Sequence, residues 1–216
     1  MRTRKPLEYI VRRYDRVAPL YNALEPLFGI LPMARRKAVR ALRLKPGDAV
    51  LEIGAGTGRN LPDLVEAVGP NGKVVALDAS RGMLEQARQL VSRRAWRNVE
   101  LVQQDAAHLT RDQLFDGVLF SLSYSVLPDP RPVLERAWEL LRPAARVVIM
   151  DAGITETPLR AVLAPLTRLL LQLGPGDPYS RPWEDLASYG PVTIERFLLN
   201  VYFVCSVEKP VTPSYS

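Results

Sequence analysis

The segment Val50-Leu-Glu-Ile-Gly-Ala-Gly-Thr-Gly-Arg-Asn60 decides the fold of this chain. A short apolar strand pattern leads into three glycines, Gly54, Gly56 and Gly58, and a helical pattern follows them. Glycines at such a point allow a tight turn and a close approach of the backbone to a ligand, most often a nucleotide. A dinucleotide-binding turn has a further glycine at the position of Arg59. We therefore expect a ligand without a diphosphate here.

The turn belongs to an alternation of strand and helix patterns that begins near residue 46. Apolar runs predict five strands, at 49–53, 73–77, 99–102, 116–121 and 146–150. Apolar residues at helical spacing predict intervening helices, at 61–68, 82–94 and 132–141. Nearly continuous apolar runs are typical of parallel strands that are buried on both faces. The alternation thus predicts βαβ units and a doubly wound α/β sheet with helices on both sides.

The two ends of the chain depart from this alternation. Residues 192–197 and 201–207 read as strands too close together for a helical crossover, so we expect an antiparallel hairpin at one edge of the sheet. A helix is expected at 158–173. Before the sheet, helices are expected at 33–42 and at 7–24, where Pro19 should kink or end the helix.

Composition bounds the class of protein. The chain has 216 residues, of which 47% are hydrophobic and 24% charged, and this suits one globular core and excludes collagen-like, disordered and disulfide-scaffold chains. The net charge of +6 is uneven: residues 1–45 carry 12 basic against 3 acidic residues (+9), and residues 46–216 carry 17 against 20 (−3). The basic excess therefore lies in the N-terminal fifth.

Neither a membrane span nor a signal peptide is expected. The longest uncharged stretches, such as 117–128, have about 12 residues, whereas a spanning helix needs roughly 20. The charged N-terminus is not followed by an apolar signal core. We therefore expect a cytoplasmic protein. Cys205 lies in an alternating apolar run and is expected to be a buried strand thiol, with no disulfide and no metal.

Polar residues gather where the predicted strands end. Asp78 ends the second strand 20 residues after Gly58, the separation at which an acidic residue binds ribose hydroxyls. Asp105 follows the third strand, where a carboxylate can accept from an adenine amino group. Each aspartate could equally be a helix N-cap. Six residues at one edge nevertheless favour a nucleoside site, because ligands of open α/β sheets bind outside the carboxyl ends of the strands; they are Glu52, Gly54, Asp78, Asp105, Ser121 and Asp151.

Four successive motifs resemble those of class I S-adenosylmethionine-dependent methyltransferases. They are Glu52-Ile-Gly-Ala-Gly-Thr-Gly58, Leu77-Asp-Ala-Ser-Arg-Gly-Met-Leu84, Gln104-Asp-Ala106, and Leu141-Arg-Pro with Arg146-Val-Val-Ile-Met150. The resemblance implies a Rossmann-like, seven-stranded, mostly parallel sheet with an antiparallel last strand. It implies S-adenosylmethionine as methyl donor and S-adenosylhomocysteine as product. The methyltransferase domain would then be residues 46–216, preceded by an amphipathic helical arm or lid at 1–45.

The same resemblance implies the cofactor-binding residues. The glycine loop would hold the methionine part, Asp78 the ribose, and Met83 with Asp105-Ala106 the adenine. The full set implied is Glu52, Gly54, Ala55, Gly56, Gly58, Asp78, Ala79, Met83, Asp105, Ala106 and Ser121.

The flanking segments are similar to soluble bacterial phosphatidylethanolamine N-methyltransferases. They are Tyr14-Asp-Arg-Val-Ala-Pro-Leu-Tyr-Asn22, Arg35-Arg-Lys-Ala-Val39 and Ser125-Val-Leu-Pro-Asp-Pro130. Ubiquinone and menaquinone C-methyltransferases share the tyrosine-containing start, but their Arg-Asn-Val after the fourth strand is replaced here by Ser121-Leu-Ser-Tyr-Ser-Val126. We therefore expect the acceptor to be a phospholipid amine. A quinone or other small molecule, and a non-catalytic binding module, are the alternatives.

Methylation of an amine needs aligned reactants and a wall that tolerates developing positive charge. Tyrosine faces provide such a wall, so Tyr14, Tyr21 and Tyr124 are expected as catalytic residues on the substrate side, against the alternative that they are core residues. His108 is a conceivable base, but a solvated or capping role is favoured. Trp183 would either cover the pocket or anchor a loop.

The basic N-terminal segment predicts adsorption to an anionic membrane, where each basic residue contributes about 1 kcal/mol. A solvated helix face is the alternative. No nucleic-acid partner is expected, because no Asn-Pro-Pro-aromatic tetrapeptide follows the fourth strand. The expected membrane contacts are Arg12, Arg13, Arg16, Arg35, Arg36 and Lys37.

Overall fold

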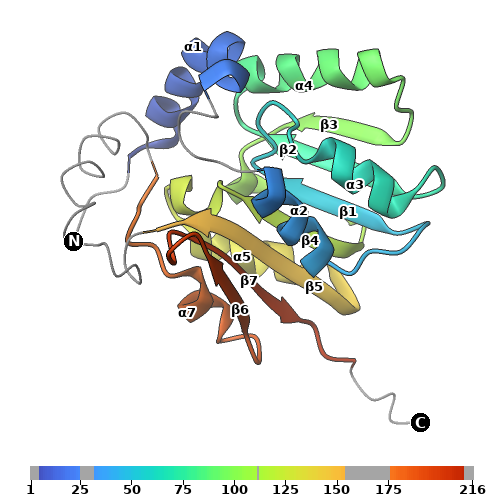
Figure 1. Cartoon of the computed structure of the whole chain (residues 1–216), viewed down its shortest axis with the longest axis vertical. Helices are drawn as coiled ribbons and strands as arrows, with labels where there is room; N and C mark the ends of the chain where they lie inside the picture. The colour runs from blue at the N-terminus through green and yellow to red at the C-terminus, as the bar shows by residue number, and fades with distance from the viewer. Residues whose placement is uncertain (1–4, 25–31, 111, 154–175, 212–216) are drawn as a thin grey trace.

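A seven-stranded sheet of order β3-β2-β1-β4-β5-β7-β6 forms the centre of the computed structural model, which describes residues 5–24, 32–110, 112–153 and 176–211 (Figure 1). Strands β1 to β5 pair in parallel, and β7 pairs antiparallel with both β5 and β6. This confirms the doubly wound α/β sheet and its C-terminal hairpin. The strands are β1 (Ala49–Ile53), β2 (Lys73–Asp78), β3 (Val99–Gln103), β4 (Phe115–Ser121), β5 (Leu141–Ala152), β6 (Thr193–Phe197) and β7 (Tyr202–Glu208).

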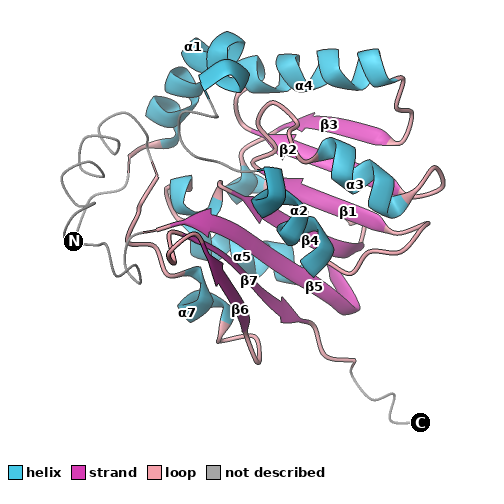
Figure 2. Ribbon diagram, in the orientation of Figure 1, coloured by secondary structure: helices cyan, strands magenta, loops and turns pink. Residues whose placement is uncertain are grey.

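Helices lie on both faces of the sheet (Figure 2). Helices α2 and α3 pack on one face, α5 lies across the other, and α1 packs against α4 beside the β3 edge. The α-helices are α1 (Leu7–Leu24), α2 (Pro32–Ala41), α3 (Leu61–Val68), α4 (Arg81–Arg94), α5 (Pro130–Glu139) and α7 (Pro182–Leu186). Two short 3-10 turns follow β3 and β4, namely η2 (Ala106–His108) and η3 (Tyr124–Val126).

Strand order reverses between β1 and β4. The chain adds β2 and β3 on one side of β1 and then returns to its other side with β4. Connections therefore leave the carboxyl ends of β1 and β4 in opposite directions, and a crevice opens between them. In open α/β sheets this switch point is where ligands bind.

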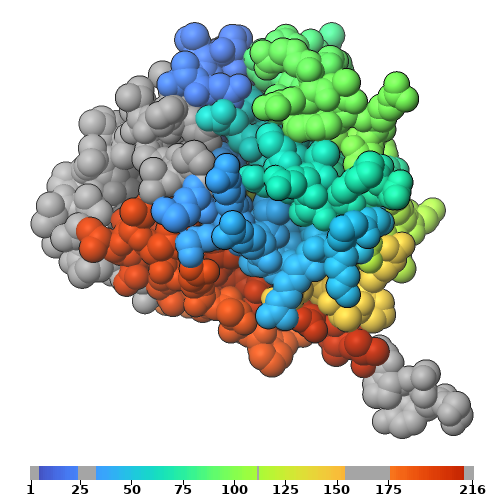
Figure 3. Space-filling model, turned by 45° about the vertical axis from the view of Figure 1, so that its right-hand side comes forward, coloured from blue at the N-terminus to red at the C-terminus, as the bar shows by residue number. Residues whose placement is uncertain are grey.

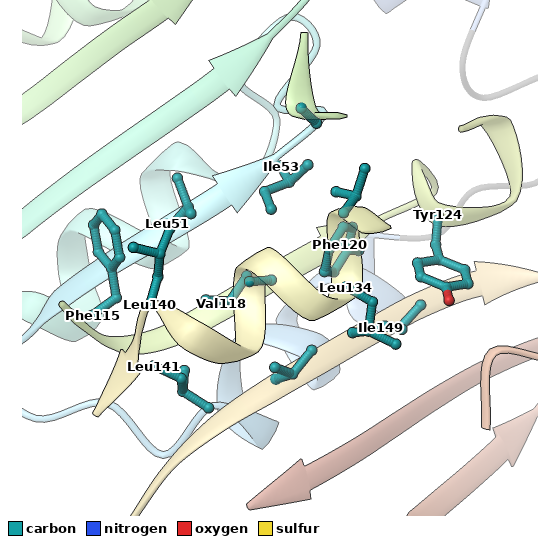
Figure 4. Packing of buried hydrophobic residues seen from close by; sticks show 14 of the residues in the cluster. Leu51, Ile53, Phe115, Val118, Phe120, Tyr124, Leu134, Leu140, Leu141 and Ile149 are labelled. Carbon is teal, nitrogen blue, oxygen red and sulfur yellow. The ribbon is translucent and has the colours of Figure 1, made fainter. Parts of the chain in front are cut away.

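The sheet is buried by two apolar layers, and β1 contributes to both. Leu51 and Ile53 face the layer that also contains Phe115, Phe120 and α5, part of which Figure 4 shows. Val50, which points the opposite way, packs with residues of α2 and α3. The helix α2 and the turn that follows it supply four buried residues to that layer, Ala34, Ala38, Val39 and Leu42. The domain division at residue 45 stays a prediction, although α2 shares its core with the sheet.

The helix expected at 7–24 is confirmed with the same bounds. Pro19 does not end it, and hydrogen bonds that Asp15 and Asn22 accept from Ser80 and Thr57 hold the helix on both sides of the proline. One expected boundary is wrong. The helix expected at 132–141 ends at Glu139, and Leu141 already pairs with Phe115 in the sheet. The helix expected at 158–173 lies outside the described residues.

Cys205 is fully buried in β7, as expected, and its Sγ lies 3.6 Å from the Ile149 carbonyl oxygen. Burial raises the pKa of this thiol well above its usual range. The thiol therefore stays protonated and behaves as a small apolar side chain.

A substitution at Gly58 tests how the glycine loop packs against α3 and α4. Its φ is +81°, and a Cβ would lie 2.7 Å from Leu61 Cδ1 and 3.3 Å from Ala87 Cβ. We expect Gly58→Ala to lower the free energy of unfolding by about 2 to 4 kcal/mol, through backbone strain and overpacking. Urea unfolding measures this.

Gly47→Ala is the matched control. Gly47 also has a positive φ, +97°, but a Cβ there would meet nothing within 4 Å. Gly47→Ala should therefore lower the free energy of unfolding by about 1 kcal/mol, from backbone strain alone. Equal costs for the two variants would contradict the packing role of Gly58.

Candidate active site

A cleft of about 860 Å³ opens at the carboxyl ends of β1, β2 and β4, beneath the helix α1. Its floor is the glycine loop, and its sides are the turns that follow β2, β3 and β4. Nine predicted cofactor residues line it, namely Gly54, Ala55, Gly56, Asp78, Ala79, Met83, Asp105, Ala106 and Ser121.

The glycine loop brings backbone close to the cleft. At Gly54, with φ +76°, a Cβ would lie only 2.4 Å from Ser123 Cβ, so no other residue fits against the turn after β4. At Gly56, with φ +57°, a Cβ would meet no atom within 4 Å. The missing side chain at Gly56 therefore leaves open space for a ligand. Gly58 differs from both, since it packs beneath the loop and does not line the cleft.

The Asp78 carboxylate is fixed by backbone donors. Gly56 N donates to Oδ2 at 2.7 Å and Ser80 N donates to Oδ1 at 2.8 Å. Burial raises the pKa of this carboxyl, whereas the two N–H groups act to lower it. Asp78 is not an N-cap, because Ser80 holds that position in α4. An oriented carboxylate in a cleft is suited to accept hydrogen bonds from ligand hydroxyls.

Asp105 both caps a turn and lines the cleft. Its Oδ1 accepts from Ala107 N at 3.0 Å, which caps η2, and its Oδ2 lies 2.9 Å from His108 Nδ1. His108 is 81% exposed and does not line the cleft. The buried Met83 and Ala106 supply an apolar surface beside this carboxylate. Carboxylate and apolar surface together suit a flat ring that carries an amino group.

One face of α1 closes the cleft from above. Leu7, Ile10, Val11, Tyr14 and Tyr21 line the cleft, and their spacing places them along one side of a helix. The rings of Tyr14 and Tyr21 meet edge to face with centroids 6.2 Å apart. Both tyrosines, which were expected on the substrate side of the site, therefore line the cleft.

Two hydrogen-bonded anchors hold α1 in place. Asp15 Oδ1 accepts from Ser80 Oγ at 2.6 Å and from Gly82 N at 2.8 Å. Asn22 Oδ1 accepts from Thr57 Oγ1 at 2.7 Å. Neither residue was predicted as a site residue from the sequence. Asp15 and Asn22 are seven residues apart, as are Tyr14 and Tyr21, and this spacing could have indicated that they lie on one side of the helix. Figure 3 shows α1 lying against α4 on the surface.

Tyr14 is suited to donate a hydrogen bond and not to act as a base. Burial, followed by the nearby Tyr21, Asp78 and Asp151, raises the pKa of its hydroxyl well above the usual range. The hydroxyl therefore keeps its proton at any physiological pH.

Tyr124 does not line the cleft, which corrects the expectation that it forms a wall for the substrate. Its side chain is fully buried, its ring packs edge to face on Phe120, and its OH donates to Asp185 Oδ2 at 2.9 Å. Figure 4 shows it near Phe120 and Ile149, among the buried hydrophobic residues. Trp183 packs on Phe203 with centroids 5.0 Å apart and likewise lies outside the cleft lining, so it anchors α7.

Asp151 also lies away from the cleft lining, although it ends β5. Its Oδ2 accepts from Ser125 N and its Oδ1 from Ala152 N, both at 2.9 Å. Burial raises the pKa of Asp151 to about 6. Asp151 therefore braces the η3 turn against the end of β5.

The structure contradicts the membrane contact expected for Arg35. Its side chain is only 8% exposed, and its Nη1 donates to Asn60 Oδ1 at 3.3 Å and to Ser121 Oγ at 3.2 Å, so that it lines the cleft. The helical spacing of α2 turns this arginine towards the sheet and its neighbour Arg36 outwards.

Glu52 lies beneath Arg35 and not in the cleft lining. Asn60 Nδ2 donates to its Oε1, and its Oε2 is buried without a hydrogen bond from the described residues. Burial raises the pKa of Glu52 to about 7, although the hydrogen bond from Asn60 and the charge of Arg35 both act to lower it.

The other predicted membrane contacts lie on the surface. Arg12 and Arg16 are exposed, and Arg13 donates to Tyr9 OH at 3.3 Å. Arg36 pairs with Asp63 at 3.5 Å, and Lys37 pairs with Glu195. Over the described ranges, no helix is long and apolar enough to cross a bilayer. The described residues also include no cluster of three or more His, Cys, Asp or Glu suited to a metal ion.

Comparisons with known proteins agree on one family. Residues 50–144 match the family model of a methyltransferase domain. The chain is 31% identical over 150 residues to a demethylmenaquinone methyltransferase of Lactobacillus johnsonii, with 68% of this chain and 62% of that protein covered. It is 32% identical over 153 residues to a 2-phytyl-1,4-naphtoquinone methyltransferase of Synechococcus elongatus, with 68% and 64% covered. The matched region thus spans less than two thirds of either relative.

A solved structure supports the same fold. The SAM-dependent methyltransferase of Aquifex aeolicus superposes with a TM-score of 0.61 at 25% identity, covering 80% of this chain and 87% of that one.

The buried Glu52 predicts a pH-dependent stability. Its folded pKa of about 7 exceeds the ordinary value of 4.5, so the folded state holds this proton more tightly and its stability contribution is lost as pH rises through about 7. Glu52→Gln stays neutral and keeps an acceptor for Asn60. Its free energy of unfolding should therefore rise relative to that of the wild type as the pH rises from 4.5 to 8. The gain should be about 3 kcal/mol, from a pKa difference of about 2.5. Parallel unfolding free energies of the two proteins across this range would contradict the shift.

The hydrogen bonds that Asp15 accepts are expected to stabilise the docked position of α1. Asp15→Ala removes an acceptor shared by Ser80 Oγ and Gly82 N, which should cost about 1 to 3 kcal/mol of local stability. Amide hydrogen exchange in α1 should then accelerate roughly 5- to 100-fold, while β1 and β4 keep their protection. Asp112→Ala, at an exposed position, is the matched control. Unchanged exchange in α1 would show that the anchor contributes nothing.

Proposed function

Because residues 50–144 are a methyltransferase domain of the S-adenosylmethionine-dependent class, we propose that this chain transfers a methyl group from S-adenosylmethionine to a quinone-type acceptor. The observation that carries the proposal is the cleft at the β1 and β4 switch point, with Asp78 and Asp105 on one side and the Tyr14–Tyr21 pair above. The names of the two relatives, both naphthoquinone methyltransferases, support the choice of acceptor.

The cleft residues fit the cofactor. Asp78, held by two backbone N–H groups, would accept from the ribose hydroxyls. Asp105 would accept from the adenine amino group, and Met83 and Ala106 would contact the ring. The space left open at Gly56 lets the cofactor pass close to the backbone. When bound, S-adenosylmethionine supplies an electrophilic methyl group on a positively charged sulfur.

The residues of the chain align the acceptor and exclude water. Anchored at Asp15 and Asn22, α1 covers the cleft with apolar side chains. Water kept out of the cleft cannot compete with the acceptor. The Tyr14 hydroxyl keeps its proton and would donate a hydrogen bond to a ring oxygen of the acceptor. The tyrosine faces would contact a flat ring.

A phospholipid amine is the second candidate. The Tyr14–Tyr21 pair that suits a quinone ring also suits a cationic amine, through the attraction of aromatic faces for positive charge. Exposed arginines at positions 12 and 16 lie on the same helix and would face an anionic bilayer. The same assay distinguishes the two acceptors.

The assay uses the purified full chain, methyl-labelled S-adenosylmethionine and vesicles that hold either a prenylated 1,4-naphthoquinol without a ring methyl group or phosphatidylethanolamine. Label should enter the naphthoquinol. Asp78→Asn should weaken binding of S-adenosylhomocysteine about 10- to 100-fold, since a carboxylate accepts stronger hydrogen bonds than an amide. Tyr124→Phe, at a buried residue outside the cleft lining, is the control and should bind as the wild type does.

Each other outcome has a distinct meaning. Label in phosphatidylethanolamine alone would replace the quinone acceptor with the phospholipid amine. Binding of S-adenosylmethionine without transfer to any acceptor would identify a non-catalytic binding module. Absence of binding would overturn the whole proposal.

A further inference from the structure

Two exposed leucines form the turn between β6 and β7. Leu198 is 44% exposed and Leu199 is 62% exposed. Both have the left-handed backbone conformation, with φ of +50° and +57°, and Asn200 continues it at +63°. This conformation strains a leucine, and turns that need it usually have glycine, asparagine or aspartate. The turn therefore carries both backbone strain and exposed apolar surface.

The base of the hairpin holds the turn in this conformation. Val201 N donates to the Leu198 carbonyl oxygen at 3.1 Å, and Gly153 N donates to the Val201 carbonyl oxygen at 2.7 Å. The rings of Phe197 and Tyr202 stack with centroids 5.9 Å apart across the last residue pair of the hairpin. Strained backbone persists where its surroundings impose it, and such positions are often functional.

The turn lies at the edge of the sheet on which the cleft opens. Tyr202, the first residue of β7, pairs with Ala152 at the end of β5. β5 runs parallel to β4, and residues at the end of β4 line the cleft. A partner that covers the two leucines is therefore brought to the carboxyl edge of the sheet.

Helix α2 adds a basic side next to the turn. Lys37 pairs with Glu195 of β6 and lies 5.7 Å from the centroid of the Phe197 ring, so the helix and the hairpin are joined. Figure 3 shows α2 bordering the C-terminal part of the chain on one face. The outer side of α2 exposes Met33, Arg36 and Arg40. Apolar side chains beside arginines are typical of surfaces that lie in the interface of an anionic membrane.

We propose that the Leu198–Leu199 turn inserts into an anionic lipid bilayer, with the basic side of α2 against the headgroups. Insertion removes the two leucine side chains from water, and the arginines attract the anionic lipids. The carboxyl edge of the sheet then faces the bilayer, so an acceptor dissolved in the lipid reaches the cleft without crossing water. This last consequence rests on the proposed function, whereas the docking itself does not.

A second copy of the chain is the competing partner, because exposed apolar patches also mark protein interfaces. Charge favours the lipid. The chain has a net charge of +6, so two copies repel each other, whereas an anionic bilayer attracts the same surface.

The test measures partition of the full chain onto sedimented vesicles, without cofactor or acceptor. Wild-type protein should bind vesicles of phosphatidylglycerol and phosphatidylcholine, and bind pure phosphatidylcholine more weakly. Leu198→Asn/Leu199→Asn should bind the anionic vesicles about 10- to 100-fold more weakly. Its urea midpoint should equal or exceed that of the wild type, because asparagine tolerates the left-handed conformation.

The matched control removes two exposed apolar side chains at the opposite edge of the sheet. Leu114 precedes β4 and Val211 follows β7, and they are 42% and 66% exposed. Leu114→Asn/Val211→Asn should therefore bind the vesicles as the wild type does.

The contribution of charge has its own pair of variants. Arg36→Gln/Arg40→Gln should bind the anionic vesicles about 10- to 30-fold more weakly and leave binding to phosphatidylcholine unchanged. Arg93→Gln/Arg94→Gln removes the same charge from exposed positions at the end of α4 and should have little effect.

Four results would overturn the inference. They are no partition of the wild type, wild-type partition of the leucine variant, an equal loss in the opposite-edge variant, and a lowered urea midpoint of the leucine variant, which would assign the leucines to folding. A dimer that dissociates in the leucine variant, without binding to vesicles, would replace the bilayer with a second copy. Methyl transfer does not enter these measurements, so failure of the proposed function would leave their outcome unchanged.

Discussion

Close contact between the glycine loop and the turn after β4 is the constraint on which the cleft depends. A side chain at residue 54 would bring its Cβ within 2.4 Å of Ser123 Cβ. With glycine there, Ser123 Oγ reaches the Ile53 carbonyl oxygen and donates to it at 2.6 Å. The carboxyl ends of β1 and β4 are thus held side by side at the point where strand order reverses. The Gly56 N–H that donates to Asp78, and the open space at Gly56, lie two residues further along the same loop.

Helix α1 shows what an amphipathic pattern can and cannot specify. The pattern states that one side of a helix has an apolar partner, but it does not identify the partner. In this protein the apolar side of α1 covers the cleft, and Asp15 and Asn22 hold it there. Membrane contact through the exposed Arg12 and Arg16 stays a prediction.

Much of the fold and of the cofactor side was predictable, because it depends on local pattern. Apolar runs gave the strands, and the spacing from the glycine loop to Asp78 gave the cleft carboxylate, since strand ends in a parallel sheet share one edge. Long-range packing decided the rest. Tyr124 and Tyr14 look alike in sequence, but one ring enters the core and the other the cleft. Arg35 and Arg36 are neighbours that α2 turns to opposite sides.

The anchoring of α1 has a consequence for the order in which the protein can be completed during synthesis. Asp15 leaves the ribosome before its partners Ser80 and Gly82, which lie 65 and 67 residues later in the chain. At about 5 to 20 residues per second, the helix waits several seconds for the surface that receives it. During that interval α1 lacks the surface of α4 against which it packs. The helix therefore docks only after β2 and α4, which follow it in the chain, have been made.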